Sequence, residues 1–380
     1  MRQQIVHAAL EAGFQLAGIA DVPEHGDAAS QLFHQRYTQW IAEGRAAEMG
    51  YLQRVNEQGE LVRASLHTAM PWARSVIVCA LNYSSDAPRS IDPAAPNTGW
   101  IARYAWSGKP SEEGGALLPT DYHDTMLERL RRVEQEVLRL AGDSIQTKCY
   151  VDTGPIVERH FAQLSGIGWI GKNACVLNQE QGSWFLLGVI VTSMPVAGAV
   201  ATLPAVDRCG SCTRCLDACP TGALTAPHQM DARLCISYLT IEKKGTIPEE
   251  LRAQMGRQIF GCDICQDVCP WNRRPPVSAG EVMQPRYELV NPSLDWIAAM
   301  DNRVFRQHFR GSPLERTGRK RLHRNTAIAM GNTGDSVHLP RLQEWAGGED
   351  AVLAEAAEWA IKRINDLQQS SRAGSASIEP

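Results

Sequence analysis

The chain has 380 residues, 44% of them hydrophobic, and a formal net charge of −4. This length and composition allow a substantial buried core in two or three domains and exclude an intrinsically disordered protein. No apolar run reaches the roughly 18 residues that a bilayer span requires, and the opening segment MRQQIVHAALEAGF is typical of an amphipathic helix, without the apolar block of a signal peptide. We therefore expect a cytoplasmic protein without a membrane segment.

The first two hundred residues alternate between extended and helical patterns. Three runs rich in β-branched and aromatic residues, bounded by Pro, Gly or Asn, predict strands: 75–83, 147–153 and 183–196. Residues 122–142 have apolar side chains at three-to-four spacing and close on Gly142, which predicts a helix. Residues 107–120 are rich in Gly, Pro and Ser and predict a surface loop. The pattern predicts an α+β domain over residues 1–200.

Asp152 is a candidate functional residue in this domain. It lies at the end of a predicted strand and precedes TGPIVER, a turn into a helix with Pro155 at an early position. A carboxyl group at a strand end, beside backbone that a cofactor can approach, can act as a proton donor. It could equally be the N-cap of the following helix, and the local sequence does not decide between these roles.

The segment GIGWIG at 166–171 matches the glycine pattern of dinucleotide-binding proteins. It follows the helical stretch PIVERHFAQLS, whereas a dinucleotide fingerprint follows a strand and opens a helix. This context argues against NAD binding. A glycine-rich turn of this kind still allows backbone to approach a bulky cofactor closely.

Eight of the eleven cysteines are crowded between Cys209 and Cys269. The first four, ending in Cys219-Pro220, fit the ferredoxin run C-x2-C-x2-C-x3-C-P. The segment CDICQDVCP adds three more cysteines, and Cys235 lies between the two groups. Eight thiolates are the number that two [4Fe-4S] clusters require.

The ferredoxin run places its fourth cysteine on the other cluster, so we expect an interleaved arrangement. One cluster would be held by Cys209, Cys212, Cys215 and Cys269, and the other by Cys219, Cys235, Cys262 and Cys265. Structural zinc is the alternative, although zinc sites have no need for the Cys-Pro ending. The remaining cysteines lie in apolar runs and are expected to be small buried residues: Cys79, Cys149 and Cys175.

Beyond Trp271 the pattern becomes helical and one segment is strongly basic. Residues 303–324 contain eight basic residues and one acid, and Arg316, Lys320 and Arg324 are four apart, so a helix would place them on one face. Such a face suits phosphates, and a solvated helix face is the alternative. Ala-rich helices resembling HEAT-like hairpins follow, and the polar tail at 367–380 is expected to be disordered.

Several motifs, taken in order, resemble the epoxyqueuosine reductase family. They are ARYAW (102–106), DYH (121–123), VDTGPIVER (151–159), GWIGKN (168–173), CISYLTIE (235–242), FGCDICQDVCPWN (260–272) and RNTAIAMGN (324–332), together with the first cysteine run. The resemblance implies a cobalamin enzyme related to reductive dehalogenases, built from three parts. These would be a nitroreductase-like cobalamin domain (1–200), a ferredoxin-like module with two [4Fe-4S] clusters (201–275) and a HEAT-like tRNA-binding part (276–366).

The resemblance also implies roles for individual residues. Asp152 matches the family's proton donor. The expected cobalamin surround is Arg63, Tyr104, Asp152, Lys172, Asn173 and Ser237. The expected tRNA-binding residues are Arg316, Arg319, Lys320, Arg321 and Arg324. The 107–120 segment looks inserted relative to the family, which leaves the alignment of Trp106 and Ser107 open.

The segment DYHDTM bears on how cobalamin would bind. It begins like the D-x-H-x-x-G motif that supplies a histidine to cobalt, but Met126 stands where glycine is needed. We therefore expect base-off cobalamin without His123 or any other protein histidine on cobalt.

The activity implied is reduction of epoxyqueuosine to queuosine at the tRNA wobble position. An external donor, either flavodoxin- or ferredoxin-type or a small reductant, would feed the clusters, Co(I) cobalamin would act on the epoxide, and Asp152 would protonate the oxygen. We expect a monomer. The alternatives are a reductive dehalogenase, a ferredoxin-type electron-transfer subunit and a noncatalytic RNA-binding module; the α+β domain argues against the second and the cysteines against the third.

Overall fold

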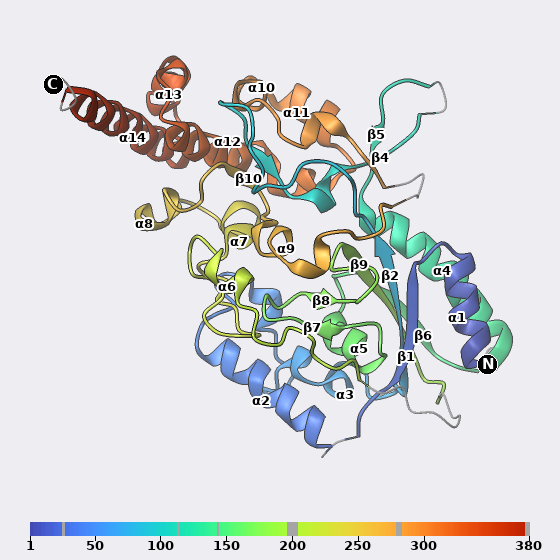
Figure 1. The fold of residues 1–380 in the computed structure, drawn as a ribbon. Helices are drawn as coiled ribbons and strands as arrows, with labels where there is room; N and C mark the ends of the chain where they lie inside the picture. The colour runs from blue at the N-terminus through green and yellow to red at the C-terminus, as the bar shows by residue number, and fades with distance from the viewer. Residues whose placement is uncertain (25–26, 112–113, 143, 196–203, 279–282, 377–380) are drawn as a thin grey trace.

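The computed structural model describes residues 1–24, 27–111, 114–142, 144–195, 204–278 and 283–376 (Figure 1). The helices are α1 Arg2–Glu11, α2 Ala28–Ala42, α3 Leu66–Ala69, α4 Tyr122–Ala141, α5 Glu158–Leu164, α6 Arg214–Asp217, α7 Ile236–Ile241, α8 Glu249–Arg252, α9 Ile264–Asp267, α10 Leu294–Ala298, α11 Asn302–Phe309, α12 Pro313–Thr333, α13 Leu339–Ala346 and α14 Ala351–Ala376. The strands are β1 Leu16–Asp21, β2 Ser75–Asn82, β3 Trp100–Ile101, β4 Ser107–Lys109, β5 Leu118–Pro119, β6 Thr147–Tyr150, β7 Trp169–Ile170, β8 Val176–Leu177, β9 Phe185–Thr192, β10 Gln258–Phe260 and β11 Gln284–Pro285. Among these described helices, none combines the length and the apolar character needed to cross a bilayer.

A four-stranded antiparallel sheet, in the order β1-β2-β9-β6, forms the centre of the N-terminal part. All eight residues of β2 are buried, so this strand is covered on both faces. Ile77 and Cys79 face a core shared with α1 and α4, whereas Val76 and Val78 face a core shared with α5. Alternation of β-branched residues between two apolar faces explains why this segment forms a central strand. Figure 1 shows α1 and α4 on one side of the sheet and α5 on the other.

The predicted strands and the long helix of the N-terminal part are confirmed, with shorter strand ends. The helix α4 ends at its C-cap Gly142, as its sequence predicts, and has Asp121 as its N-cap. The predicted surface loop at 107–120 is in part a hairpin, because β4 pairs with both β5 and β11. Residues 112–113 of that segment lie outside the described part.

The helix predicted to begin near Pro155 starts later. Val157 is the N-cap of α5, and Glu158 is its first residue. Asp152 is therefore not a helix N-cap. The glycine-rich segment 166–171 follows α5 and leads into β7, so it does not open a helix, in agreement with the expectation that it is not a dinucleotide fingerprint.

The cysteine-rich part is built from short helices and is joined to the N-terminal part by β10. This strand pairs in parallel with β3, which lies more than 150 residues earlier in the chain. One hydrophobic core extends from Trp100 through Phe260 and Leu322 to Ile364. The cysteine-rich part and the C-terminal helices therefore share a core, and residue 276 does not separate two independent cores.

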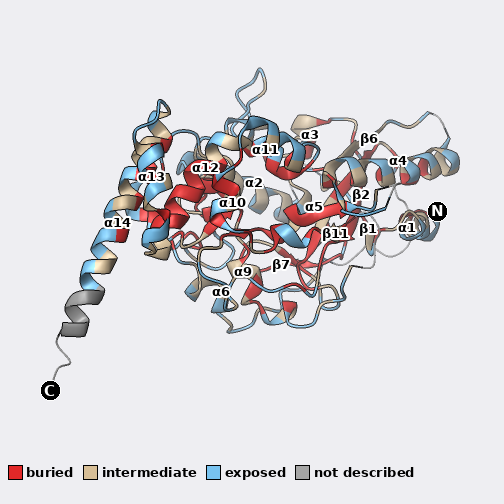
Figure 2. Ribbon diagram, turned by 90° about the horizontal axis from the view of Figure 1, so that it is seen from above, coloured by how far each residue is buried: buried red, intermediate tan, exposed pale blue. Residues whose placement is uncertain are grey.

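The C-terminal helices α12, α13 and α14 pack on one another, and α14 extends away from the body of the molecule (Figure 2). The expectation of a disordered tail from residue 367 is wrong for the described portion, because α14 continues to Ala376. A helix that is already nucleated by packing adds further residues at little cost, and the next proline is Pro380. Residues 377–380 lie outside the described part.

The helix α12 is interrupted at Gly318, where φ is 73° and ψ is 158°. Only glycine adopts this backbone conformation without strain. The prediction that Arg316, Lys320 and Arg324 share one helix face is wrong, because the interruption separates Arg316 from the other two.

Arg324 lies inside the molecule, with 1% of its surface exposed. Its guanidinium group donates to the carbonyl oxygens of Leu239 at 2.7 Å, Lys243 at 2.9 Å and Gly245 at 2.6 Å, and to the side chain of Asn325. Burial of this cation lowers its pKa to about 10. The prediction that Arg324 contacts tRNA is therefore wrong: the residue fastens α12 to the segment that follows α7.

Replacing Arg324 by Met should destabilise the protein by about 3 kcal/mol or more, because three buried carbonyl groups lose their donor. Urea unfolding followed by circular dichroism measures the loss. The matched control is Arg310→Met, at an exposed arginine, which should change the free energy of unfolding by about 0.5 kcal/mol or less. An R324M protein with parental stability would contradict the structural role.

Candidate active site

Asp152 lies on a tight turn directly after β6. Its φ of 56° is uncommon for a residue other than glycine, and the amide of Thr153 donates to the carbonyl of Val151 at 2.6 Å. A Cβ atom at Gly154 would lie 2.5 Å from Cγ of Tyr150, so only glycine fits there. The turn presents the Asp152 carboxyl group outward, with 60% of the side chain exposed.

Two consecutive residues of α4 converge on this carboxylate. The hydroxyl of Tyr122 donates a short hydrogen bond to Oδ2 of Asp152, and Nε2 of His123 lies 3.8 Å from the same oxygen. Burial, together with the charge of Asp152, raises the pKa of Tyr122. Tyr122 therefore remains a neutral hydrogen-bond donor at physiological pH.

Asp121 and Arg316 hold His123 from the other side. Oδ1 of Asp121 accepts from the backbone amide of His123 at 3.0 Å and lies 2.7 Å from its Nδ1. Arg316 donates to Oδ2 of Asp121 at 2.8 Å, and its Nη2 and Nη1 lie 2.7 Å from Nδ1 and 3.1 Å from Nε2 of the ring. Burial opposes ionisation of Asp121, but the hydrogen bonds from His123 and the charge of Arg316 together lower its pKa.

Aromatic side chains from the N-terminal part of the chain lie around Asp152. The Tyr104 ring meets the Tyr122 ring edge-on at a centroid distance of 5.9 Å. The guanidinium of Arg63 lies 5.6 Å from the centroid of the Tyr51 ring, and 52% of Tyr51 is exposed. Burial and then the charge of Asp152 raise the pKa of Tyr104.

The helix α7 supplies the opposite side of the site. Burial and then the charge of Glu242, the C-cap of this helix, raise the pKa of Tyr51 to about 12, with a further contribution from Asp152. Ser237 lies in the first turn of α7, directly after Cys235. Of the predicted cobalamin contacts, Arg63 and Tyr104 thus lie near Asp152. Ser237 lies at the opposite end of α7 from Glu242.

Glu158 is a second carboxyl group close to Asp152. Its Oε1 is buried and has no hydrogen-bond partner among the described residues. Burial, followed by the charge of Asp152, raises the pKa of Glu158 to about 7, although Arg63 and Arg159 act in the opposite direction.

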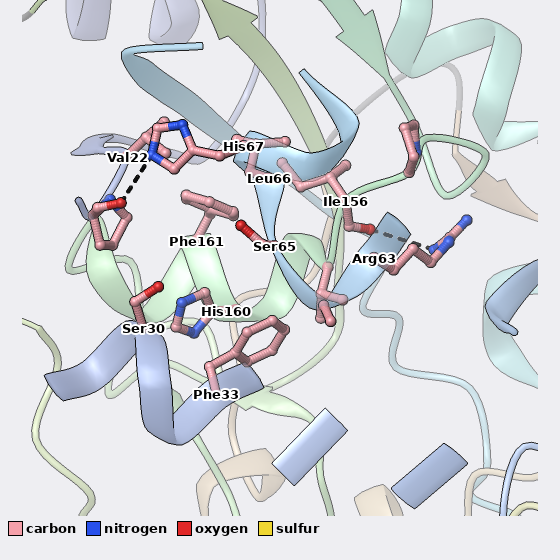
Figure 3. Close-up of a pocket in the computed structure, with 14 residues that line it drawn as sticks. Val22, Ser30, Phe33, Arg63, Ser65, Leu66, His67, Ile156, His160 and Phe161 are labelled. Atoms are coloured by element: carbon pink, nitrogen blue, oxygen red, sulfur yellow. Dashed lines mark hydrogen bonds between the residues drawn. The ribbon is translucent and has the colours of Figure 1, made fainter. Parts of the chain in front are cut away.

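Behind Arg63 lies a small enclosed cavity, shown in Figure 3, which is also lined by Ser30, Phe33, His67 and His160. Its volume is about 20 Å³, enough for one water molecule. The ring of His160 stacks on Phe33 at 4.2 Å, and burial lowers its pKa to about 4, so it packs as a neutral ring. The cavity is too small for an organic cofactor.

Lys172 and Asn173 contact the cysteine-rich segment. The ammonium group of Lys172 donates to the carbonyls of Gly210 at 2.7 Å and Cys212 at 2.9 Å. Asn173 is buried and donates to the carbonyl of Cys265 at 3.4 Å. These two residues therefore position cysteine-bearing backbone, a role that differs from the predicted direct contact with cobalamin.

The structure brings together the first predicted cysteine set: Cys209, Cys212, Cys215 and Cys269. Burial, with smaller contributions from the charges of Cys209 and Cys215, raises the pKa of Cys269 to about 11. Backbone amides donate to the sulfur atoms, from Lys172 to Cys209 and from Trp271 to Cys269. Amides aimed at thiol groups suit an iron–sulfur cluster, whose sulfur ligands accept such bonds.

The second predicted set also lies together: Cys219, Cys235, Cys262 and Cys265. The charges of Cys235 and Cys219 act on Cys262, and those of Cys262 and Cys235 act on Cys265. All eleven cysteines are free thiols. In the described ranges, no three His, Cys, Asp or Glu side chains lie close enough to hold a single metal ion.

Cys175 has a contact that its apolar sequence context does not suggest. Its side chain is hydrogen-bonded to that of Cys265, and its backbone amide donates to Oδ1 of Asn173 at 3.1 Å. The expectation that it is a small buried residue therefore leaves out its contact with a predicted cluster ligand.

The predicted tRNA-binding residues differ in accessibility. Lys320 is the most open, with 78% of its side chain exposed and an ion pair to Asp350 at 3.1 Å. Arg319 is half-buried and donates to the side chain of Asn302, and Arg321 donates to the carbonyl of Ile241. Three further exposed arginines lie on or next to α11: Arg303, Arg306 and Arg310.

Several groups at the site were not identified individually from sequence: Tyr51, Asp121, Tyr122, Glu158 and Glu242. Their participation depends on contacts between distant segments, which spacing along the chain does not reveal. The sequence signals were that Asp121 and Tyr122 belong to DYH, Glu158 to VDTGPIVER and Glu242 to CISYLTIE, three of the motifs that carry the family resemblance.

Comparison with known families gives two matches. Residues 208–272 match a family described as a 4Fe-4S double cluster binding domain. Residues 63–153 match a family described as epoxyqueuosine reductase QueG, DUF1730. The first match makes the chain an iron–sulfur redox protein, in agreement with the two cysteine sets.

Similarity to characterised proteins extends over nearly the whole chain. The epoxyqueuosine reductase of Pseudomonas aeruginosa is 36% identical over 96% of this chain and 94% of its own length, and that of Escherichia coli is 35% identical over 95% and 89%. A crystal structure of epoxyqueuosine reductase with an epoxyqueuosine-modified tRNA-Tyr stem loop aligns at a TM-score of 0.81 and 31% identity, covering 100% of this chain and 94% of the other. The chain belongs to the epoxyqueuosine reductase family.

The raised pKa of Glu158 has a consequence for stability. Because the folded state holds a proton on this group up to about pH 7, whereas the unfolded chain releases it near 4.5, stability should fall as pH rises between these values. Glu158→Gln should remove this fall and raise stability above pH 7 by an amount on the order of 1 kcal/mol or more. Thermal unfolding of both proteins from pH 4.5 to 8 measures the difference.

The matched control for this prediction is Glu136→Gln, at a surface residue of α4 paired with Arg139. That change should leave the pH dependence between 4.5 and 7 unaltered. Parallel stability curves for E158Q and the parent would show that Glu158 ionises normally in the folded protein.

Proposed function

We propose that this protein reduces epoxyqueuosine to queuosine in the anticodon loop of tRNA. The observation that carries the proposal is the outward-facing Asp152 carboxylate on the turn after β6, which accepts a hydrogen bond from Tyr122 and lies 3.8 Å from Nε2 of His123. The identity to curated epoxyqueuosine reductases and the structural likeness to the enzyme with a modified tRNA stem loop support it. Because the wobble base lies in a single-stranded loop, it can enter a pocket without melting a helix.

We assign three parts to this activity. Residues 1–200 form a nitroreductase-like part for cobalamin, residues 201–275 a ferredoxin-like module, and residues 276–366 a HEAT-like part for tRNA. The protein acts as a monomer in the cytoplasm, with electrons from an external flavodoxin- or ferredoxin-type donor or a small reductant. Within the module, the first cysteine set holds one [4Fe-4S] cluster and the second set holds the other.

Cobalamin is the proposed partner of Asp152. Exposed aromatic surface at Tyr51, the guanidinium of Arg63 and the first turn of α7 at Ser237 suit a large ring with an apolar rim and amide side chains. When bound, the reduced corrinoid supplies the low-potential electrons that open the epoxide. Both ring nitrogens of His123 already face Arg316 or Asp121, which supports the base-off form without this histidine on cobalt.

The protein's own residues would handle the proton and the geometry. Conversion of an epoxide to an alkene consumes two electrons and two protons and releases water. Asp152 delivers a proton to the departing oxygen, and Tyr122 and His123 keep the carboxyl group aimed at it. With the corrinoid and the RNA bound, the aromatic side chains around Asp152 would help to exclude water from the reacting atoms.

Asp152→Asn should lower kcat at least 100-fold, because an amide cannot deliver the proton. Cobalt content, iron content and binding of an epoxyqueuosine-containing stem loop should stay at parental levels. Nucleoside mass spectrometry of the reacted RNA measures turnover, and Asp366→Asn, at an exposed site on α14, is the control. Parental turnover by D152N would remove Asp152 from the mechanism.

The proposed tRNA surface consists of the exposed cations around the interruption in α12. Lys320 is its most accessible member, and Arg303, Arg306 and Arg310 extend it along α11. Arg319 and Arg321 are half-buried and contribute the exposed parts of their side chains to this surface. Side chains of this kind bind phosphates without regard to sequence.

Lys320→Ala should raise the KM for tRNA about threefold to tenfold, with kcat and cluster content unchanged, since one phosphate contact is lost. The slope of log Kd against log salt should fall by roughly one unit. Filter binding at several salt concentrations measures this slope, and Arg132→Ala on α4 is the charge-matched control. Unchanged salt dependence in K320A would place the RNA elsewhere.

A further inference from the structure

Arg316 makes contacts that set it apart from the other cations of its segment. Its terminal nitrogens face Asp121 and both ring nitrogens of His123, at distances from 2.7 to 3.1 Å. Lys320, four residues later, pairs with Asp350 at 3.1 Å and has 78% of its side chain exposed. The Arg316 side chain is 49% exposed, but its guanidinium group faces the residues that hold Asp152.

We infer that Arg316 is a positioning residue that holds the Asp152 turn in its reactive place through Asp121, Tyr122 and His123. This inference rests on the proposed role of Asp152. It assigns Arg316 a function in the chemical step, distinct from the phosphate binding that its position in a basic run suggests.

The Asp152 turn needs support from neighbouring residues. Its backbone has positive φ and its side chain is 60% exposed, so the turn has little support of its own. A crystal structure of the Bacillus subtilis epoxyqueuosine reductase, 31% identical and aligned at a TM-score of 0.79, has its catalytic aspartate loop swung out of the active site. An equivalent displacement here would break the hydrogen bond from Tyr122 to Asp152.

Arg316 contacts both residues that flank Tyr122 in the chain, Asp121 and His123. Asp121 caps α4 and fixes the backbone of the two residues after it, and only 12% of its side chain is exposed. An isolated exposed ion pair contributes about 1 kcal/mol or less. Here one guanidinium, itself 49% exposed, bridges a carboxylate and an imidazole whose side chains are each only 12% exposed, so water screens these contacts less than those of a fully exposed pair.

Arg316 is itself anchored by Arg321. Its carbonyl accepts from Nη2 of Arg321 at 2.7 Å, and Nη1 of Arg321 donates to the carbonyl of Ile241 at the end of α7. The interruption at Gly318 turns this short segment toward α4. Arg316 thus connects three regions: the end of α7, the tRNA-binding segment and the Asp152 turn.

Three variants and a combined one test the inference: Arg316→Gln, Arg316→Lys, Asp121→Asn, and R316Q with D121N. In the reconstituted enzyme, R316Q should lower kcat about tenfold, equivalent to 1.4 kcal/mol, with KM for the stem loop within twofold. R316K should recover part of the loss. The double variant should be no slower than the slower single variant, because both changes break one network.

A second measurement is independent of turnover. Hydrogen–deuterium exchange of peptides covering residues 150–157 should be faster in R316Q than in the parent, while peptides from β2 exchange equally. Arg139→Gln, at an exposed pair near the far end of the same helix α4, should leave both kcat and exchange unchanged. Thermal unfolding and iron content verify that each variant is folded and loaded.

A raised KM with parental kcat would overturn the inference and make Arg316 a phosphate contact. Unaltered exchange in residues 150–157 would also overturn it. Additive losses in the double variant would also count against it. Faster exchange in R316Q, combined with an active D152N enzyme, would instead keep the positioning role of Arg316 and remove the proposed role of Asp152.

Discussion

The burial of one guanidinium group, that of Arg324, sets the spatial relation between the parts of this molecule. It satisfies carbonyl oxygens at and beyond the end of α7, including that of Leu239, while Arg321 binds the carbonyl of Ile241. The same helix begins directly after Cys235. A short helix therefore has a predicted cluster ligand at one end and the C-terminal helices fastened to the other. A cation this deeply buried tolerates little displacement, because moving it would leave several polar groups unpaired.

The site is assembled from segments that are far apart in sequence, and each contributes a different property. The sheet supplies the turn that exposes Asp152, α4 supplies the donors that hold it, and α7 closes the opposite side. Glu158 adds a carboxyl group that is neutral at acidic pH and buried beside the first. Burial and the charge of Asp152 raise the pKa of Glu158, whereas the Asp152 side chain is 60% exposed and can reach a substrate.

Local sequence patterns predicted the elements that neighbouring residues stabilise. They failed where contacts between distant residues determine the structure. The apolar run of β2, the periodicity and caps of α4, and the spacing of the cysteines all carry their meaning in neighbouring residues. The burial of Arg324 does not, because it depends on carbonyl acceptors some 80 residues away. The 3.6-residue period assumes an unbroken helix. It therefore placed Arg316 on one face with Lys320 and Arg324, from which the structure separates it. For the same reason, the local pattern offered Asp152 as a candidate residue but not the residues that contact it.

The hydrophobic core shared by the cysteine-rich part and the C-terminal helices has a consequence for biosynthesis. The last cysteine of the second run, Cys269, leaves the ribosome about 95 residues before Ile364, which completes that core. Until then, Cys235 and Cys262 of the second set lack part of the core against which they pack. Packing of that set is therefore expected to be completed only after the C-terminal helices have been synthesised.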